Sequence, residues 1–359
     1  MKKNYFYVDL IKVTAIFLVI FLHTAGIHLS QWHQVSFSAW MTENAYDAFT
    51  RMSVPLFVMI SGAMLLQKEE SYYDFFKKRL SKILIPAVTW IGFYLVWRIV
   101  HSNESFSIKA MLKMVISGPV YYHLWYLYMI VGLYLVTPII RIITKNSTKR
   151  DLTYICGLWI IFVSIIPTLL YILKYKYNID LQFGITLPLI TGHVGYFILG
   201  YLLNQYDPKK SHVYLSWAGL IVSWLLTTFG TLYFTSLLGN FTDIFYSYFS
   251  PTVVLEAISG FILLNYYGKL LEEKLSEKTK HIFSLLGIAS FGVYLIHPAI
   301  RDILLSKHLY FSVDTLKINP IISNPLAAIE VAVISYLVVS VMLKIPVVNL
   351  TVGGGKKNT

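Results

Sequence analysis

Long apolar stretches constrain this chain more than any other feature of its sequence. The segment from Ile11 to Gly26 consists almost entirely of Ile, Val, Leu, Phe and Ala, and similar blocks recur along the 359-residue chain. A helix rises about 1.5 Å per residue, so a block of about 20 residues crosses a hydrocarbon core of about 30 Å. A barrel strand would instead alternate in polarity over about ten residues. The sequence therefore predicts an all-α, polytopic membrane protein.

The apolar blocks predict about ten transmembrane helices. We expect them at residues 8–28, 52–67, 80–100, 122–143, 152–173, 184–204, 212–236, 246–267, 282–303 and 322–345. Ten crossings place both termini on one side, and the connections and tails on that side carry 20 Lys and Arg, against nine on the other. The positive-inside rule therefore predicts that both termini are cytoplasmic. Residues 1–345 are expected to form a single transmembrane domain, followed by a short cytoplasmic tail, residues 346–359.

Composition and charge exclude other classes of protein. Hydrophobic residues make up 56% of the chain and charged residues only 13%, which favours lipid as the main surrounding. The net charge of +12 does not indicate a nucleic-acid-binding protein, because most Lys and Arg lie between apolar blocks. The single cysteine, Cys156, excludes an intrachain disulfide and a cysteine-based metal site, and we expect no bound metal.

A few ionisable side chains lie at membrane depth, where charge is costly, so each is a candidate functional residue. They are Asp9, Lys12, His23, Arg79, Lys82, His123, His193, Glu256, His297 and Glu330. Lys12 and His23 are 11 residues apart. At about 100° and 1.5 Å per residue they share one helix face, about 16 Å apart. A snorkelling lysine and a structural histidine would give the same spacing, so spacing alone leaves both readings open.

The predicted topology sorts these residues by depth. His23, His123 and His297 all fall near the outer ends of their spans, whereas Arg79 and Lys82 begin the third span at the cytoplasmic face. Residues three apart are neighbours on a helix, so this basic pair is either an ordinary membrane flank or a phosphate-binding site.

Five segments form a recognisable set: Asp9, Lys12 and His23 at the start, then Arg51–Gly62, Phe76–Pro86, His123–Leu127 and Phe291–His297. Together they resemble the membrane-bound acyltransferase family 3, which moves acyl groups, usually acetyl, onto extracytoplasmic glycans. The family usually carries Arg where Lys12 and Lys82 stand, and lysine keeps the charge but lacks the bidentate fork. Many larger members also carry a Glu pair where this chain has Ile130 and Val131, which leaves Glu256 as the candidate acid.

The resemblance implies a membrane O-acyltransferase that uses cytoplasmic acetyl-CoA, in a bacterial plasma membrane. The imidazole of His23 is the expected base or acetyl carrier, with Lys12 and Asp9 beside it. Three basic residues are expected to hold the coenzyme A phosphates: Arg79, Lys82 and Lys78. The acceptor, a glycan or polyprenyl-linked sugar, is expected to contact His123, Trp125, Tyr126, Tyr294, His297, Arg51 and Glu256.

Two other functions fit the same residues. Intramembrane His and Glu also build proton relays, and related membrane regions fused to serine racemases are thought to support amino-acid supply, so a serine transporter is the main alternative. The chain would otherwise be a non-catalytic partner of a glycan-synthesis complex.

Overall fold

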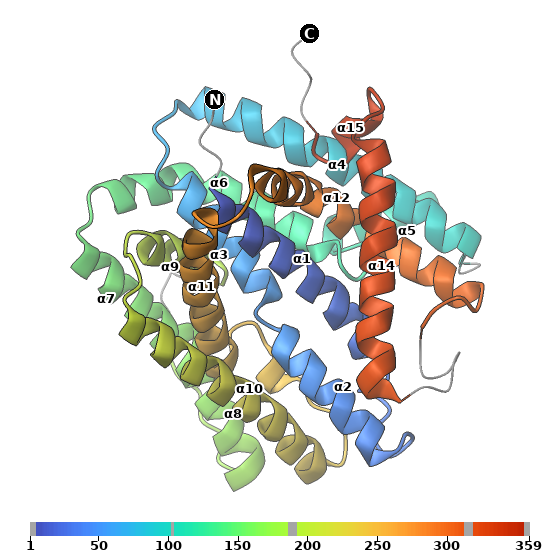
Figure 1. Ribbon diagram of the computed structural model, residues 1–359. Helices are drawn as coiled ribbons and strands as arrows, with labels where there is room; N and C mark the ends of the chain where they lie inside the picture. The colour runs from blue at the N-terminus through green and yellow to red at the C-terminus, as the bar shows by residue number, and fades with distance from the viewer. Residues whose placement is uncertain (1–4, 102–103, 186–191, 312–318, 355–359) are drawn as a thin grey trace.

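The computed structural model describes residues 5–101, 104–185, 192–311 and 319–354, and it contains helices and no strand in these ranges (Figure 1). The helices are α1 (Phe6–Ala25), α2 (Phe37–Thr50), α3 (Ser53–Leu65), α4 (Tyr72–His101), α5 (Ile108–Ser117), α6 (Trp125–Lys145), α7 (Lys149–Trp159), the π-helix η1 (Ile160–Ile165), α8 (Ile166–Tyr177), α9 (Val194–Asn204), α10 (Lys210–Leu238), the 3₁₀-helix η2 (Ile244–Tyr246), α11 (Pro251–Glu272), α12 (Glu277–Ser306), α14 (Pro320–Met342) and α15 (Val348–Thr351).

The helical segments confirm an all-α polytopic membrane protein. Nine segments within the described ranges are long and apolar enough to cross a membrane, and the 11-residue α9 is a shorter apolar helix. The predicted span at 184–204 lies partly outside the described residues, and its described helix begins at Val194. Three of the described helices were not predicted: α2, α5 and the four-residue α15. The α2 sequence escaped a search for apolar runs because it carries Glu43, Asn44 and Asp47 on a buried face.

Polar contacts link the connections that are rich in Lys and Arg at one end of the bundle. We call this end the basic end. Lys145 Nζ lies 2.9 Å from Glu69, and Lys269 Nζ lies 2.7 Å from Asp207. The hydroxyl of Tyr7, in the first turn of α1, donates to Asn204 at 3.0 Å. The Tyr7 hydrogen bond joins the beginning of α1 to the end of α9, and the two ion pairs join the ends of α6 and α11 to neighbouring connections, as alternating crossings require. In Figure 1 the beginning of α1 and helix α15 lie toward the same, upper end.

Helix α1 lies in the middle of the bundle and packs on α2, α3, α11, α12 and α14. Ile11, Ala15, Ile16 and Ile20 are fully buried. A helix that is covered on several sides must be apolar on several sides, which accounts for its nearly unbroken hydrophobic sequence. Any polar side chain on α1 therefore faces other protein groups or a cavity inside the bundle.

Glycines allow the closest helix contacts. A Cβ at Gly62 of α3 would lie 1.9 Å from the carbonyl oxygen of Phe197, and one at Gly200 of α9 would lie 2.0 Å from that of Met59. Only glycine fits where two backbones approach this closely, as is common between membrane helices. Helices α3 and α9 are thus locked together by backbone contact.

The segment after α14 folds back onto the bundle. The indole Nε1 of Trp90 in α4 donates to the carbonyl oxygen of Thr351 at 2.9 Å, and Val352 is buried. Gly353, with a positive φ of 79°, lies against Phe291 of α12. This segment covers α4 and α12 where the two helices border the cavity described next.

Candidate active site

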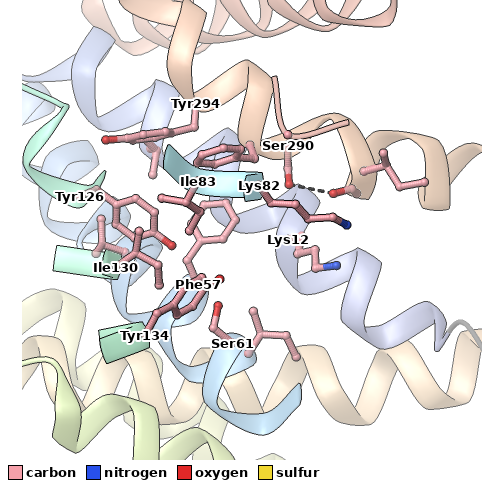
Figure 2. A pocket seen from close by; sticks show the side chains of 17 residues that line it. Lys12, Phe57, Ser61, Lys82, Ile83, Tyr126, Ile130, Tyr134, Ser290 and Tyr294 are labelled. Atoms are coloured by element: carbon pink, nitrogen blue, oxygen red, sulfur yellow. Dashed lines mark hydrogen bonds between the residues drawn. The ribbon is translucent and has the colours of Figure 1, made fainter. Parts of the chain in front are cut away.

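A cavity of about 340 Å³ lies between α1, α3, α4, α6 and α12 (Figure 2). Lys12 of α1 and Lys82 of α4 line it, and Figure 2 shows both ammonium groups directed to the same side of the pocket. Tyr126 and Tyr294 line the other side. Most remaining wall residues are apolar, so this is a mainly apolar cavity with two lysines on one side.

Lys12 is placed in this cavity by its neighbour Asp9. Its Nζ lies 3.8 Å from Asp9 Oδ1, and the Asp9 side chain is almost fully buried. Asp9 packs against Gly287 of α12, where an added Cβ would lie 2.6 Å from Oδ1. The carboxylate provides a negative charge that holds the lysine at the cavity wall. Lys12 therefore faces the interior of the bundle rather than the lipid.

Three histidines meet near the opposite end of the bundle: His23 of α1, His297 of α12, and His123 in the turn before α6. The rings of His23 and His297 are stacked, with centroids 5.5 Å apart and planes at 17°. The rings of His123 and His297 are also 5.5 Å apart, edge to face. Tyr122, which sequence reasoning missed, places its ring 4.8 Å from that of His23. His297 is thus the central imidazole of the group.

One hydrogen bond fixes the tautomer of His297. Its Nδ1 lies 2.8 Å from the carbonyl oxygen of Tyr294 in the preceding turn of α12. A carbonyl oxygen can only accept, so Nδ1 carries the proton and Nε2 of the neutral ring is an acceptor. Nε2 is buried and has no hydrogen-bond partner among the described residues.

A second, very small cavity of about 10 Å³ touches His23, His123, Ser53, Trp125 and Tyr248. This volume is close to that of a single water-sized probe. Four of its wall residues also line the larger cavity: Val19, Val54, Tyr126 and Tyr294. One layer of side chains therefore separates His23 from the larger cavity, which Lys12 and Lys82 line.

Aromatic rings surround the small cavity on the side away from the lysines. The ring of Trp125 lies 5.5 Å from that of Tyr248 and 5.7 Å from that of His193. The hydroxyl of Tyr196 donates to the carbonyl oxygen of Tyr248 and holds its backbone. Sequence reasoning gave Tyr248 no role, because it belongs to none of the motifs and falls at the start of the expected span 246–267. In the structure it lies in the connection before α11.

The sequence profile of the acyltransferase 3 family, described as an acyltransferase domain, matches residues 5–344. This chain belongs to that family. No curated protein and no solved structure matches the chain significantly. The family match covers every element that forms the two cavities except the segment around Gly353, and it establishes a membrane acyltransferase.

In this acyltransferase the two residues of the predicted phosphate-binding pair, Arg79 and Lys82, have different surroundings. Lys82 lines the larger cavity, whereas Arg79, one helical turn earlier, lies 3.7 Å from Glu70 and does not line it. Glu70 also contacts Lys78 at 3.3 Å and Arg141 at 3.0 Å. Burial acts to raise the pKa of Glu70, but hydrogen bonds from Arg141 and Lys78 and the charge of Arg79 hold it below its usual value.

Glu70 and Arg141 were not predicted as members of the site. Their connections had been assigned to one side of the membrane, but no pattern in the sequence indicates that the two side chains meet. Arg141 also donates from Nε and an NH₂ group to the carbonyl oxygen of Leu65, at 3.0 and 2.8 Å. It thereby ties the end of α6 to the end of α3 and holds Glu70 near the basic residues of α4.

Three residues predicted to contact the acceptor line neither cavity: Arg51, Glu256 and His297. Arg51 pairs with the buried carboxylate of Asp47, and its guanidinium lies 4.2 Å above the ring of Tyr246. Glu256 is fully buried, and neither carboxylate oxygen has a hydrogen-bond partner among the described residues. The structure therefore brings His23, His123, Trp125, Tyr126 and Tyr294 together at the cavities, but not Arg51 or Glu256. His297 joins this group through its ring contacts with His23 and His123.

Proposed function

We propose that this acyltransferase is an O-acetyltransferase that passes an acetyl group from acetyl-CoA, bound at the basic end, to a hydroxyl of a glycan or lipid-linked sugar. One observation carries this proposal. The cavity lined by Lys12 and Lys82 shares four wall residues with the small cavity at His23. The ammonium groups of Lys12 and Lys82, a mainly apolar cavity and the imidazole of His23 therefore follow one another from one end of the bundle toward the other.

The basic end suits the donor. Coenzyme A joins several phosphate charges to a long, slender arm with a terminal thiol. Lys12 and Lys82 would attract the phosphates, and the mainly apolar cavity beyond them would take the arm. Close by, three cations surround the single carboxylate of Glu70, which leaves a positive local charge. These cations would draw the donor to the mouth even though Arg79 does not line the cavity.

His23 is suited to the chemistry of the transfer. Acetyl transfer requires a group that takes the acceptor's hydroxyl proton or carries the acetyl group between donor and acceptor. A neutral imidazole can do either near neutral pH. His23 contacts the small cavity, one side-chain layer from the larger cavity. In the proposed role Asp9 and Lys12 hold the charge at the donor end, and His23 acts on the acetyl group.

The aromatic wall suits a sugar. Trp125 and Tyr248 both line the small cavity, with ring centroids 5.5 Å apart, and sugar rings stack on aromatic faces. The chain also resembles the enterobacterial common antigen O-acetyltransferase at Ser53–Phe57, His123–Trp125 and Asn240–Asp243, although this resemblance does not fix the acceptor. The acceptor, its polyprenyl carrier, any glycan-synthesis partner and the bacterial plasma membrane belong to this proposal.

The test compares surface glycans from cells that lack the gene with cells that carry it. We expect O-acetyl groups on one glycan only when the gene is present, and their loss in the His23→Ala variant. His281→Ala, an exposed histidine of α12, is the matched control and should restore acetylation. Unchanged glycans together with gene-dependent serine uptake would favour the transporter instead.

A further inference from the structure

One ring nitrogen of His297, Nε2, is a proton acceptor with no partner among the described residues, and its ring stacks on that of His23. Its Nδ1 is committed to the carbonyl oxygen of Tyr294, and its Nε2 is buried without a partner among the described residues. The residue is only 1% exposed. A buried polar atom without a hydrogen bond destabilises the folded protein, so such an atom in a native protein requires an explanation.

The missing partner must be a hydrogen-bond donor. Because the tautomer leaves a lone pair on Nε2, any group that forms a hydrogen bond with this atom must donate an N–H or O–H. A packing role would not need it, since the bond to Tyr294 and the ring contacts to His23 and His123 already hold the imidazole. The hydroxyl of an acceptor sugar is a donor of the required kind.

We propose that His297 is a second catalytic residue whose Nε2 takes the proton of the acceptor hydroxyl, while His23 carries the acetyl group. This inference rests on the proposed function and divides its chemistry between two stacked rings. His297 is suited to be the base because its tautomer is fixed. His23, which contacts the small cavity beside the larger one, is suited to be the carrier.

The two steps balance as follows. A ring nitrogen of His23 attacks the thioester carbonyl carbon, the C–S bond breaks, and the leaving thiolate takes the proton from the other ring nitrogen. The acceptor oxygen then attacks the acetyl carbon on His23 while His297 Nε2 takes its proton, and the C–N bond breaks. The proton returns from His297 to the ring of His23, and both imidazoles are restored.

The test separates the two steps. The variant His297→Asn keeps an amide N–H near the position of Nδ1, so the bond to Tyr294 can survive, and it removes Nε2. His297→Gln places an amide near Nε2 that can accept a hydrogen bond but cannot take a proton. His281→Asn, exposed on the same helix, is the matched control. Thermal unfolding of the purified variants identifies any that fail to fold.

The first step is measured as rapid release of coenzyme A thiol by purified protein in lipid nanodiscs with acetyl-CoA alone. The second is measured as O-acetyl content of surface glycans in cells, which requires no knowledge of the acceptor. We expect a burst of about one thiol per protein in the wild type and in both His297 variants. Acetylation should fall at least about 100-fold in those variants, in the range of general-base catalysis, and should be unchanged in His281→Asn.

Several results would overturn the inference. Acetylation by His297→Asn within tenfold of wild type would exclude a base at Nε2. Loss of the burst together with acetylation in a folded His297→Gln protein would make His297 a positioning residue. Acetylation without a wild-type burst would refute the division between the rings while leaving the proposed function intact. A wild type that neither releases thiol nor acetylates glycans would refute both.

Discussion

Replacing Gly287 with alanine tests the contact that positions Lys12. An added Cβ would lie 2.6 Å from Asp9 Oδ1 and 3.1 Å from Asp9 Cβ, whereas ordinary contacts fall between 3.4 and 4 Å. The oxygen can rotate away, but the Cβ is fixed to the backbone of α1. Relief therefore requires α1 and α12 to separate by a few tenths of an ångström, which moves Asp9 and the lysine paired with it.

The expected magnitude follows from two opposing effects. Overpacking costs about 1–3 kcal/mol, and exchanging glycine for alanine within a helix gains up to about 1 kcal/mol. Gly132 of α6 is the matched control, because a Cβ there would meet nothing within 4 Å. Gly287→Ala should therefore be about 1–3 kcal/mol less stable than Gly132→Ala.

Thermal unfolding of both variants in the same detergent measures this difference, and acetyl-CoA titration measures its functional effect. We expect a lower Tm and a higher Kd for acetyl-CoA in Gly287→Ala, because a displaced Asp9 holds Lys12 less firmly at the cavity. A Gly287→Ala protein at least as stable as Gly132→Ala would refute the close contact between α1 and α12.

The remaining predictions concern single side chains. His23→Ala should lower acetyl transfer by about 10²–10⁴-fold with little change in acetyl-CoA binding, and a loss below tenfold would contradict a base or carrier role. Arg79→Ala should weaken acetyl-CoA binding in a salt-sensitive way, whereas Lys82→Arg should be tolerated. If Arg79→Ala raised only the acceptor concentration that the enzyme requires, the proposed position of the acetyl-CoA site would be wrong. Because the folded-state pKa of Glu70 lies below its usual value of 4.5, its charge stabilises the fold above that pH, and this contribution is lost as the pH falls through the folded pKa. Glu70→Gln should thus be less stable than wild type at pH 7, with the gap closing in acid; an equal gap at all pH values would refute the ion-pair role.

The positions of most spans could be predicted because lipid demands internally hydrogen-bonded helices of a fixed minimum length. The exceptions show what hydropathy misses. Helix α2 has a buried polar face whose charges are met by other protein groups: Glu43 pairs with His28 at 2.6 Å and Asp47 with Arg51. Such a helix has no apolar run, and its partners are apparent only after the chain has folded.

The site was predictable only to the extent that one helix or one motif carries it. Helical periodicity placed Lys12 and His23 on a common face, and depth placed three histidines near one end. The contacts of His23 with Tyr122 and of Glu70 with Arg141 depend on how distant helices pack, which no spacing within a single sequence encodes. The interpretation of Arg51 as an acceptor contact overlooked Asp47, a partner one helical turn away.

Transfer from one side of the membrane to the other is the central claim, and sided proteoliposomes test it most directly. Protein would be reconstituted in one orientation, with labelled acetyl-CoA supplied to the basic end and a lipid extract containing the glycan acceptor incorporated in the bilayer. We expect labelled glycan exposed only at the opposite face, and no label when acetyl-CoA is supplied to that face. Labelled glycan exposed on the same face as the acetyl-CoA would contradict transfer through the bundle.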